Sequence, residues 1–211
     1  MLEEEPSEHL QWPMFITAAG ADPKFVNRAL LLIQGFVRSE HLADSKWTLF
    51  TSTDLPSTTP PPTSSPVTEG FQNDFAGLSP AEINEFMNTH SAELDEMTLT
   101  FELWMVLDEM GLETGTCVIC KHPYNGGDDD EPATWGYTEE FEGLRVPLDQ
   151  ACAVYASLYT GREFEDYIAN GEWPDGTYRF DPQQIKEPTD PEVLERKEKA
   201  WQLWQGQGVV D

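Results

Sequence analysis

The sequence predicts an α/β (or α+β) fold: a single domain with a mixed sheet flanked by helices, plus a C-terminal helix. Two apolar segments of strand length, residues 98–107 and 116–121, are separated by a short turn region. Helix-start signals, the strongest at Ser79, occur before and after these segments. With 39% hydrophobic and 11% aromatic residues, the chain also has enough apolar side chains to bury a core.

Four segments are predicted to build the sheet. Residues 98–107 first alternate between polar and apolar side chains and then become fully apolar, which is typical of a strand with one solvated end and a buried centre. Residues 116–121 follow as a second apolar strand after a turn that contains Gly111 and Gly115. The other two predicted strands are residues 47–53, rich in threonine and aromatic side chains, and residues 141–146.

A first helix is predicted to start near Asp22, which acts as the N-cap, with Pro23 at the first helical position. Apolar side chains then recur at helical spacing and predict one buried face. These side chains are Phe25, Ala29, Leu32, Ile33, Phe36 and Val37.

A second helix start has the clearest local pattern in the chain, "LSPAEINEFM". Ser79 is the expected N-cap, Pro80 the first helical residue, and Glu82 completes a capping box. Leu78 and Ile83 occupy the two positions of a hydrophobic staple. The predicted buried stripe consists of Ile83, Phe86 and Met87.

A third helix is predicted over residues 147–161, with Gly161 as its stop, and a short helix over residues 162–171 follows it. The expected apolar face of the helix over residues 147–161 consists of Leu148, Cys152, Tyr155 and Tyr159. In the last helix Trp201 and Trp204 share one side, so they either dock on the domain or form a contact with a partner.

These elements divide the chain into three predicted parts. The parts are an acidic disordered tail (1–19), the α/β domain (20–182) with a Pro/Ser/Thr-rich loop at 55–70, and a C-terminal extension (183–211) with helix 190–205.

The charge of the chain is strongly one-sided, with 12 basic against 39 acidic residues and a net charge of −27. Such a surface repels phosphate backbones and anionic lipids, which argues against direct binding of nucleic acid or membrane. It suits a basic protein as partner and favours solubility.

The cysteine count and the first residues predict a cytoplasmic protein with reduced thiols. Three cysteines are too few, and odd in number, for a disulfide framework. The segment "MLEEEPSEHLQW" is acidic where a signal peptide would be basic and then apolar. The longest apolar run, residues 29–33, is too short to span a bilayer. No cofactor is predicted, and the oligomeric state stays open.

Several quoted segments follow one another in an order that is similar to a known domain. "WTLFTSTDLP", "EGFQNDFAGLSPAEINEF", "FELWMVLDE" and "FEGLRVPLDQACAVYASLYTGREFEDYI" resemble an uncharacterised domain of bacteria and fungi, domain of unknown function 6924, over roughly residues 46–180. Here "TSTD" lacks the arginine that precedes the Thr-Asp pair in the family, and "ACAVYASLY" lacks its asparagines. The resemblance implies an α/β domain and transfers no catalytic residue.

The "CVIC" segment has the spacing of half a zinc or redox site, with Cys117, Cys120 and the nearby His122 as candidate metal ligands. Successive side chains of a strand alternate, so Cys117 and Cys120 are expected to point to opposite faces. Redox chemistry would also need the motif to open a helix. The sequence therefore favours two structural thiols over a metal or redox site.

Candidate catalytic residues are Asp54 and Asp108, which each follow a predicted strand, and His122 at a strand exit. Ligand crevices in α/β sheets form at such strand ends. Turn initiation or helix capping is the alternative role of the two aspartates. The contiguous acids of residues 125–131 do not match an EF-hand loop and predict a solvated turn.

The leading functional hypothesis is an acidic soluble interaction or accessory protein without a catalytic site. The first alternative is a small enzyme, a hydrolase or an accessory enzyme of fungal metabolism, with a crevice near Asp54, Asp108 and His122. The second is a polyanion mimic that binds a basic protein.

Overall fold

The computed structural model describes residues 11–34, 46–63, 66–67, 72–125, 136–184 and 191–211. The strands in these ranges are β1 (Trp12–Ile16), β2 (Trp47–Phe50), β3 (Leu103–Leu107), β4 (Thr116–Lys121), β5 (Tyr124–Asn125), β6 (Gly136–Tyr137), β7 (Glu142–Pro147), β8 (Ile168–Glu172) and β9 (Tyr178–Phe180). The α-helices are α1 (Pro23–Ile33), α2 (Pro80–Thr89), α3 (Ser91–Glu96), α4 (Glu109–Thr114), α5 (Leu148–Tyr159) and α6 (Pro191–Gly206). Two 3₁₀ turns, η2 (Phe164–Asp166) and η3 (Pro182–Gln184), flank the β8–β9 pair.

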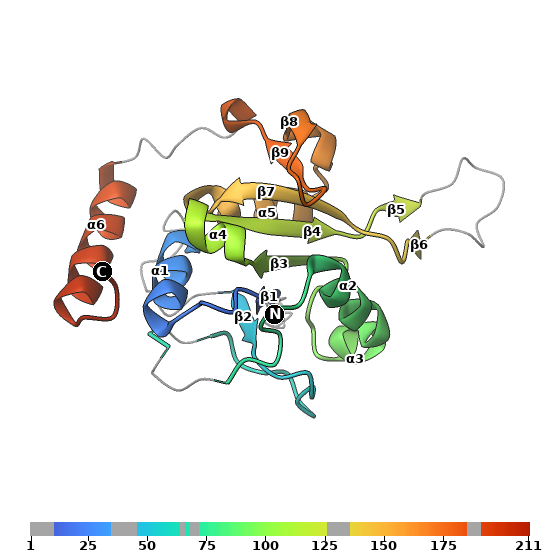
Figure 1. Ribbon diagram of the computed structural model, residues 1–211, viewed down its shortest axis with the longest axis horizontal. Coiled ribbons are helices and arrows are strands. Elements are labelled where there is room, and N and C mark those ends of the chain that lie inside the picture. The colour runs from blue at the N-terminus through green and yellow to red at the C-terminus, as the bar shows by residue number, and fades with distance from the viewer. Residues whose placement is uncertain (1–10, 35–45, 64–65, 68–71, 126–135, 185–190) are drawn as a thin grey trace, which may run out of the picture.

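Seven strands form one mixed sheet in the order β2-β1-β3-β4-β7-β9-β8 (Figure 1). β1 runs parallel to both β2 and β3, whereas β4 is antiparallel to β3 and to β7. β9 is parallel to β7 and antiparallel to β8. β5 and β6 form a separate two-stranded ribbon. This arrangement confirms the predicted α/β fold with a mixed sheet and a C-terminal helix.

The apolar side chains of the sheet alternate between two cores. Along β3, Leu103, Met105 and Leu107 belong to a core with apolar residues of α1 and α5, whereas Trp104 and Val106 belong to a core with apolar residues of α2 and α3. All five residues of β3 are buried. Helices therefore cover both faces of the sheet, which explains why its central strands read as continuous apolar runs.

The N-terminal prediction needs a correction, because part of the expected disordered tail (1–19) is a central strand. β1 lies between β2 and β3, and all of its residues are buried. Its sequence, "WPMFI", is apolar throughout because both of its faces are covered. The acidic residues before it concealed this short signal, and residues 1–10 lie outside the described ranges.

Two further predicted elements are wrong. Residues 98–102 are not part of β3: the backbone of Thr98 has a φ of 55°, and Leu99 forms only an isolated bridge with Gln11. The alternating pattern there arises because Leu99 packs into the core from a bend. Residues 162–171 form the η2 turn and the start of β8 rather than a helix.

The helix-start predictions are confirmed. The Asp22 carboxylate accepts a hydrogen bond from the Phe25 amide at 2.8 Å. The Ser79 hydroxyl accepts from the Glu82 amide at 3.3 Å, and the Glu82 carboxylate accepts from the Ser79 amide at 2.7 Å. Gly161, the predicted stop of α5, has a positive φ of 99°, which glycine adopts without strain.

The apolar faces of the helices were predicted in part. In α1, Ala29 and Ile33 are buried as expected, and Phe25 and Leu32 pack at the edge of the core, while Phe36 and Val37 lie outside the described residues. In α5 the buried stripe steps by three or four residues and includes Leu148, Ala151, Val154, Tyr155 and Leu158. Tyr159 was expected on this stripe but is 47% exposed, because the buried stripe ends one residue earlier, at Leu158.

The C-terminal helix docks on the domain beside α1 (Figure 1). Leu31 of α1 packs with Val193, Ala200 and Trp204 of α6, and the Lys24 ammonium lies 2.6 Å from the Asp211 carboxylate. Trp204 is only 3% exposed, so this side chain is part of the core rather than a contact for a partner. Trp201 packs at the edge of the same cluster.

Candidate functional site

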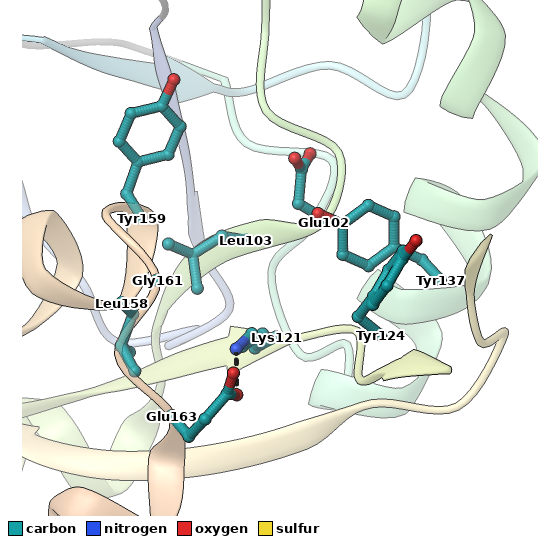
Figure 2. A pocket seen from close by; sticks show the side chains of 9 residues that line it. All are labelled: Glu102, Leu103, Lys121, Tyr124, Tyr137, Leu158, Tyr159, Gly161 and Glu163. Carbon is teal, nitrogen blue, oxygen red and sulfur yellow. Dashed lines mark hydrogen bonds and ion pairs between the residues drawn. The ribbon is translucent and has the colours of Figure 1, made fainter. Parts of the chain in front are cut away.

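A pocket of about 180 Å³ lies where β3 starts and β4 ends, next to the β5–β6 ribbon and the C-terminal end of α5. We call it the tyrosine pocket (Figure 2). It is lined by Glu102, Leu103, Lys121, Tyr124, Tyr137, Leu158, Tyr159, Gly161 and Glu163. The lining comes from segments that are far apart in the sequence and meet only in the folded chain.

Aromatic side chains form two walls of the tyrosine pocket. The rings of Tyr124 and Tyr137 contact each other, with centroids 5.3 Å apart and planes at 67°. Figure 2 shows this pair on one side and Tyr159 on the other, with Leu103 between them. Tyr124, Tyr137 and Tyr159 are 56%, 43% and 47% exposed, and they are the only strongly exposed large aromatic side chains in the described ranges. Concentration of exposed aromatic surface in one hollow is typical of a binding site.

Carboxylates give the tyrosine pocket a negative charge. The Lys121 ammonium lies 2.7 Å from Oε2 of Glu163, so the charges of these two side chains cancel. Glu102 adds a further negative charge that acts on the Tyr137 hydroxyl. Burial and the nearby Glu102 carboxylate raise the pKa of Tyr137, so its hydroxyl stays protonated at neutral pH. The pocket can therefore attract a cation, and Tyr137 does not supply a base.

The floor of the tyrosine pocket is apolar. Leu103 and Leu158 are 2% and 4% exposed, and both belong to the core between the sheet and helices α1 and α5. An apolar floor below carboxylates and aromatic rings fits a side chain with an aliphatic stem and a positive head. The pocket thus has the lining expected for a basic side chain.

A second pocket, of about 250 Å³, lies at the carboxyl ends of β1 and β3. We call it the switch-point pocket, because the chain leaves β1 for β2 on one side while β3 lies on the other. Open α/β sheets bind ligands at such a point. Its lining residues are Thr17, Ala19, Gly77, Leu78, Asp108, Glu109, Met110 and Asp175.

Two acidic groups of the switch-point pocket, Asp108 and Asp175, are held by internal contacts. Asp108 is the N-cap of α4 and accepts from the Gly111 amide at 2.8 Å, and its two oxygens lie 2.9 and 2.5 Å from the Arg145 guanidinium. Asp175 accepts from Arg145 at 2.6 Å and from the Thr177 hydroxyl at 2.7 Å. The Arg145 side chain is fully buried. Both carboxylates therefore join β3 and the β8–β9 turn to β7.

Arg145, Asp108 and Asp175 form a charged triad, and its contacts explain the pKa shifts within it. Burial alone would lower the pKa of Arg145, but the hydrogen bonds that it donates to Asp108 and Asp175 raise it above the ordinary value. Burial opposes ionisation of Asp175, yet Thr177 and Arg145 hold the pKa of Asp175 below its ordinary value. Arg145 and Asp175 thus stay charged at neutral pH, and the Asp175 carboxylate is not available as a proton acceptor.

The three candidate catalytic residues do not share one crevice, so this part of the enzyme hypothesis is wrong. Asp108 follows the last residue of β3, whereas His122 follows Lys121, which pairs with the first residue of β3. A five-residue strand separates the two ends by roughly 13 Å or more. Asp54 is exposed in the loop after β2 and does not line the switch-point pocket.

His122 has a structural role in the second core. It is 1% exposed, its Nε2 lies 2.7 Å from the Asn84 side-chain oxygen, and its ring packs on Trp104 with centroids 4.7 Å apart. Burial lowers the pKa of His122 to about 4. The side chain is therefore neutral at physiological pH and donates to Asn84 rather than to a substrate.

The two strand cysteines point to opposite faces of the sheet, as the sequence predicts. Cys117 belongs to the core with α1 and α5, and Cys120 to the core with α2 and α3. Both are fully buried, and burial raises the pKa of each thiol. Within the described residues, no group of three or more His, Cys, Asp or Glu side chains is arranged to hold a metal ion. Residues 126–131 of the acidic run lie outside the described ranges.

This burial predicts a large difference in thiol reactivity. In the native protein, Cys152 is expected to react with a thiol reagent such as Ellman's reagent, because it is half-buried, while Cys117 and Cys120 stay unreacted. All three should react in denaturant. A count of modified thiols in each condition checks this, and fast native labelling of a second thiol would contradict the described burial.

Sequence reasoning named Asp108, which lines the switch-point pocket, but missed the other polar residues of the two pockets. Arg145 left a signal, because a lone arginine inside an apolar strand must be paired when it is buried. Asp175, its second partner, left none. The pocket tyrosines also left no local signal, because Tyr124, Tyr137 and Tyr159 lie in different elements.

Comparison of the chain with protein-family models, curated proteins and solved structures finds no significant match. The resemblance to domain of unknown function 6924 therefore stays a prediction. Among the helices in the described ranges, none has the length and apolar character needed to cross a bilayer.

Proposed function

We propose that this chain is a non-enzymatic interaction protein that binds a basic segment of a partner protein through the tyrosine pocket. One observation carries the proposal: the strongly exposed aromatic side chains of the described ranges converge, with Glu102 and Glu163, on a single hollow. Aromatic rings and carboxylates together favour a cationic group over a neutral or anionic one.

The overall charge supports a basic partner. A net charge of −27 creates a long-range field that speeds the approach of cations and disfavours anions. Ions screen this field, so the affinity should fall as salt rises. The charge supplies attraction, and the tyrosine pocket supplies the specific contact.

A catalytic role is supported less well by the same geometry. Two of the three carboxylates that line the switch-point pocket, those of Asp108 and Asp175, are bound to Arg145, and His122 is buried at the other end of β3. Catalysis needs a base within reach of a substrate proton, and neither group meets this condition. Polyanion mimicry differs from the proposal in that its binding would depend on total charge and not on any one glutamate.

The proposal is tested by fluorescence anisotropy with a labelled ten-residue peptide that alternates arginine or lysine with glycine and serine. Wild-type protein should bind it, and the affinity should fall as salt is raised from about 50 to about 300 mM. Glu102→Gln should weaken binding about fivefold, since it removes a charge at the pocket.

Glu113→Gln is the matched control, because Glu113 is exposed on α4 at the opposite end of the sheet and its change alters the net charge equally. It should leave the affinity nearly unchanged. Equal losses in both variants would favour polyanion mimicry, and a peptide that does not bind at low salt would refute the proposal.

A further inference from the structure

We infer, resting on the proposed function, that the tyrosine pocket accepts an arginine side chain of the partner in preference to a lysine side chain. The preference follows from the shape of the aromatic wall, from the position of Lys121 and from the size of the hollow.

The aromatic wall offers flat surfaces at an angle to each other. The planes of Tyr124 and Tyr137 differ by 67°, and both rings are partly exposed. A planar guanidinium can stack on one ring face while its N–H groups point in its own plane toward an acceptor. A lysine ammonium is a compact point charge and makes no such stacked contact.

The acceptor beside this wall is the Glu102 carboxylate. Figure 2 shows the Glu102 side chain beside the Tyr137 ring, and both residues line the pocket. Carboxylates bind the fork of a guanidinium through two parallel hydrogen bonds. The wall and Glu102 together therefore match a flat cation with several donors.

One of the two carboxylates of the pocket, Glu163, is already paired with an ammonium of the chain itself. Lys121 puts its ammonium 2.7 Å from Glu163, inside the same hollow. A second ammonium at this carboxylate would be repelled by the first. The remaining acidic group, Glu102, lies on the aromatic side of the pocket, where stacking is available.

The size of the hollow limits the occupant to one side chain. A volume of about 180 Å³ above Leu103 and Leu158 has room for a methylene stem and a charged head, and not for a folded element. The partner segment therefore inserts one residue, and its other basic groups contact the acidic surface outside.

The test compares two ten-residue peptides of equal charge, one with arginine and one with lysine as the basic residue, by isothermal titration calorimetry on the full chain. We expect the arginine peptide to bind about tenfold more tightly. Tyr124→Leu should remove this difference, whereas Tyr124→Phe, which keeps the ring, should retain it. Tyr124 is 56% exposed, so neither change disturbs the core.

Lys121→Met provides a second arm. It removes the internal ammonium from Glu163, so it should strengthen binding of the lysine peptide more than that of the arginine peptide. Equal affinities of the two peptides in wild-type protein, both weakened by Glu102→Gln, would overturn the arginine preference and leave the proposed function intact. Absence of binding by both peptides would overturn the proposed function as well.

Discussion

Arg145→Met is expected to lower the free energy of unfolding by about 3–5 kcal/mol. The Arg145 side chain is fully buried and contacts both Asp108 and Asp175, which are themselves only 16% and 27% exposed. Methionine fills a similar volume but leaves two carboxylates close together without a counter-charge, and such unpaired buried charges are strongly destabilising. Urea denaturation followed by circular dichroism measures the change.

Arg162→Met is the matched control for this experiment. Arg162 pairs with Asp166 at 3.5 Å, and the two side chains are 65% and 49% exposed. Exposed pairs contribute about 1 kcal/mol or less, so the control should unfold near the wild-type midpoint. Similar losses of unfolding free energy in the two variants would mean that the contacts of Arg145 with Asp108 and Asp175 do not stabilise the fold as expected.

The second large effect is a dependence of stability on pH that originates from His122. Burial lowers the pKa of His122 from 6.5 to about 4 in the folded state. Between these two values the unfolded chain binds a proton and the folded chain does not, so stability falls as the pH is lowered through this window. The difference corresponds to about 3 kcal/mol, which is fully present above pH 6.5 and lost by about pH 4.

The measurement is the urea unfolding free energy at several pH values between about 4 and 7 for wild type and His122→Gln. The many carboxylates also titrate near the acid end, so the informative quantity is the difference between the two proteins. His122→Gln should remove the histidine contribution. His90→Gln, at a partly exposed histidine, should keep it, and equal pH dependence in wild type and His122→Gln would contradict the described burial.

Local patterns predicted the elements whose cause is local. The capping box at Ser79 and Glu82 depends on residues three apart, and the strand at 116–121 is a short apolar run between turns. The opposite directions of Cys117 and Cys120 follow from the pleat of one strand. In each case the physical reason lies within a few residues, so the sequence contains all of it.

The elements that were missed depend on distant residues. β1 is a strand because β2 and β3 pair with both of its edges. The residues near Trp12 do not predict this pairing. The bend at Thr98 is likewise set by contacts with the start of β1, where the Gln11 amide donates to the Thr98 carbonyl at 3.2 Å. Propensity gives only a weak preference that such tertiary contacts override.

The candidate site was beyond sequence reasoning for the same reason. Glu102, Lys121, Tyr137 and Tyr159 belong to different segments, and each is an ordinary surface residue when it is read alone. Their chemistry emerges only when β4 pairs with β3 and α5 ends beside them. The charge of the chain suggested a basic partner as a prediction, and only the fold brings together the residues of the proposed binding site.

The position of β1 has a consequence for synthesis of the protein. Trp12 pairs with Trp47, 47 − 12 = 35 residues later, and Met14 pairs with Met105, 105 − 14 = 91 residues later. This apolar strand must therefore wait until about 91 further residues have left the ribosome before both of its edges are covered. During this interval its unpaired backbone groups can attract other nascent chains, and chaperone binding near residue 12 would shorten that exposure.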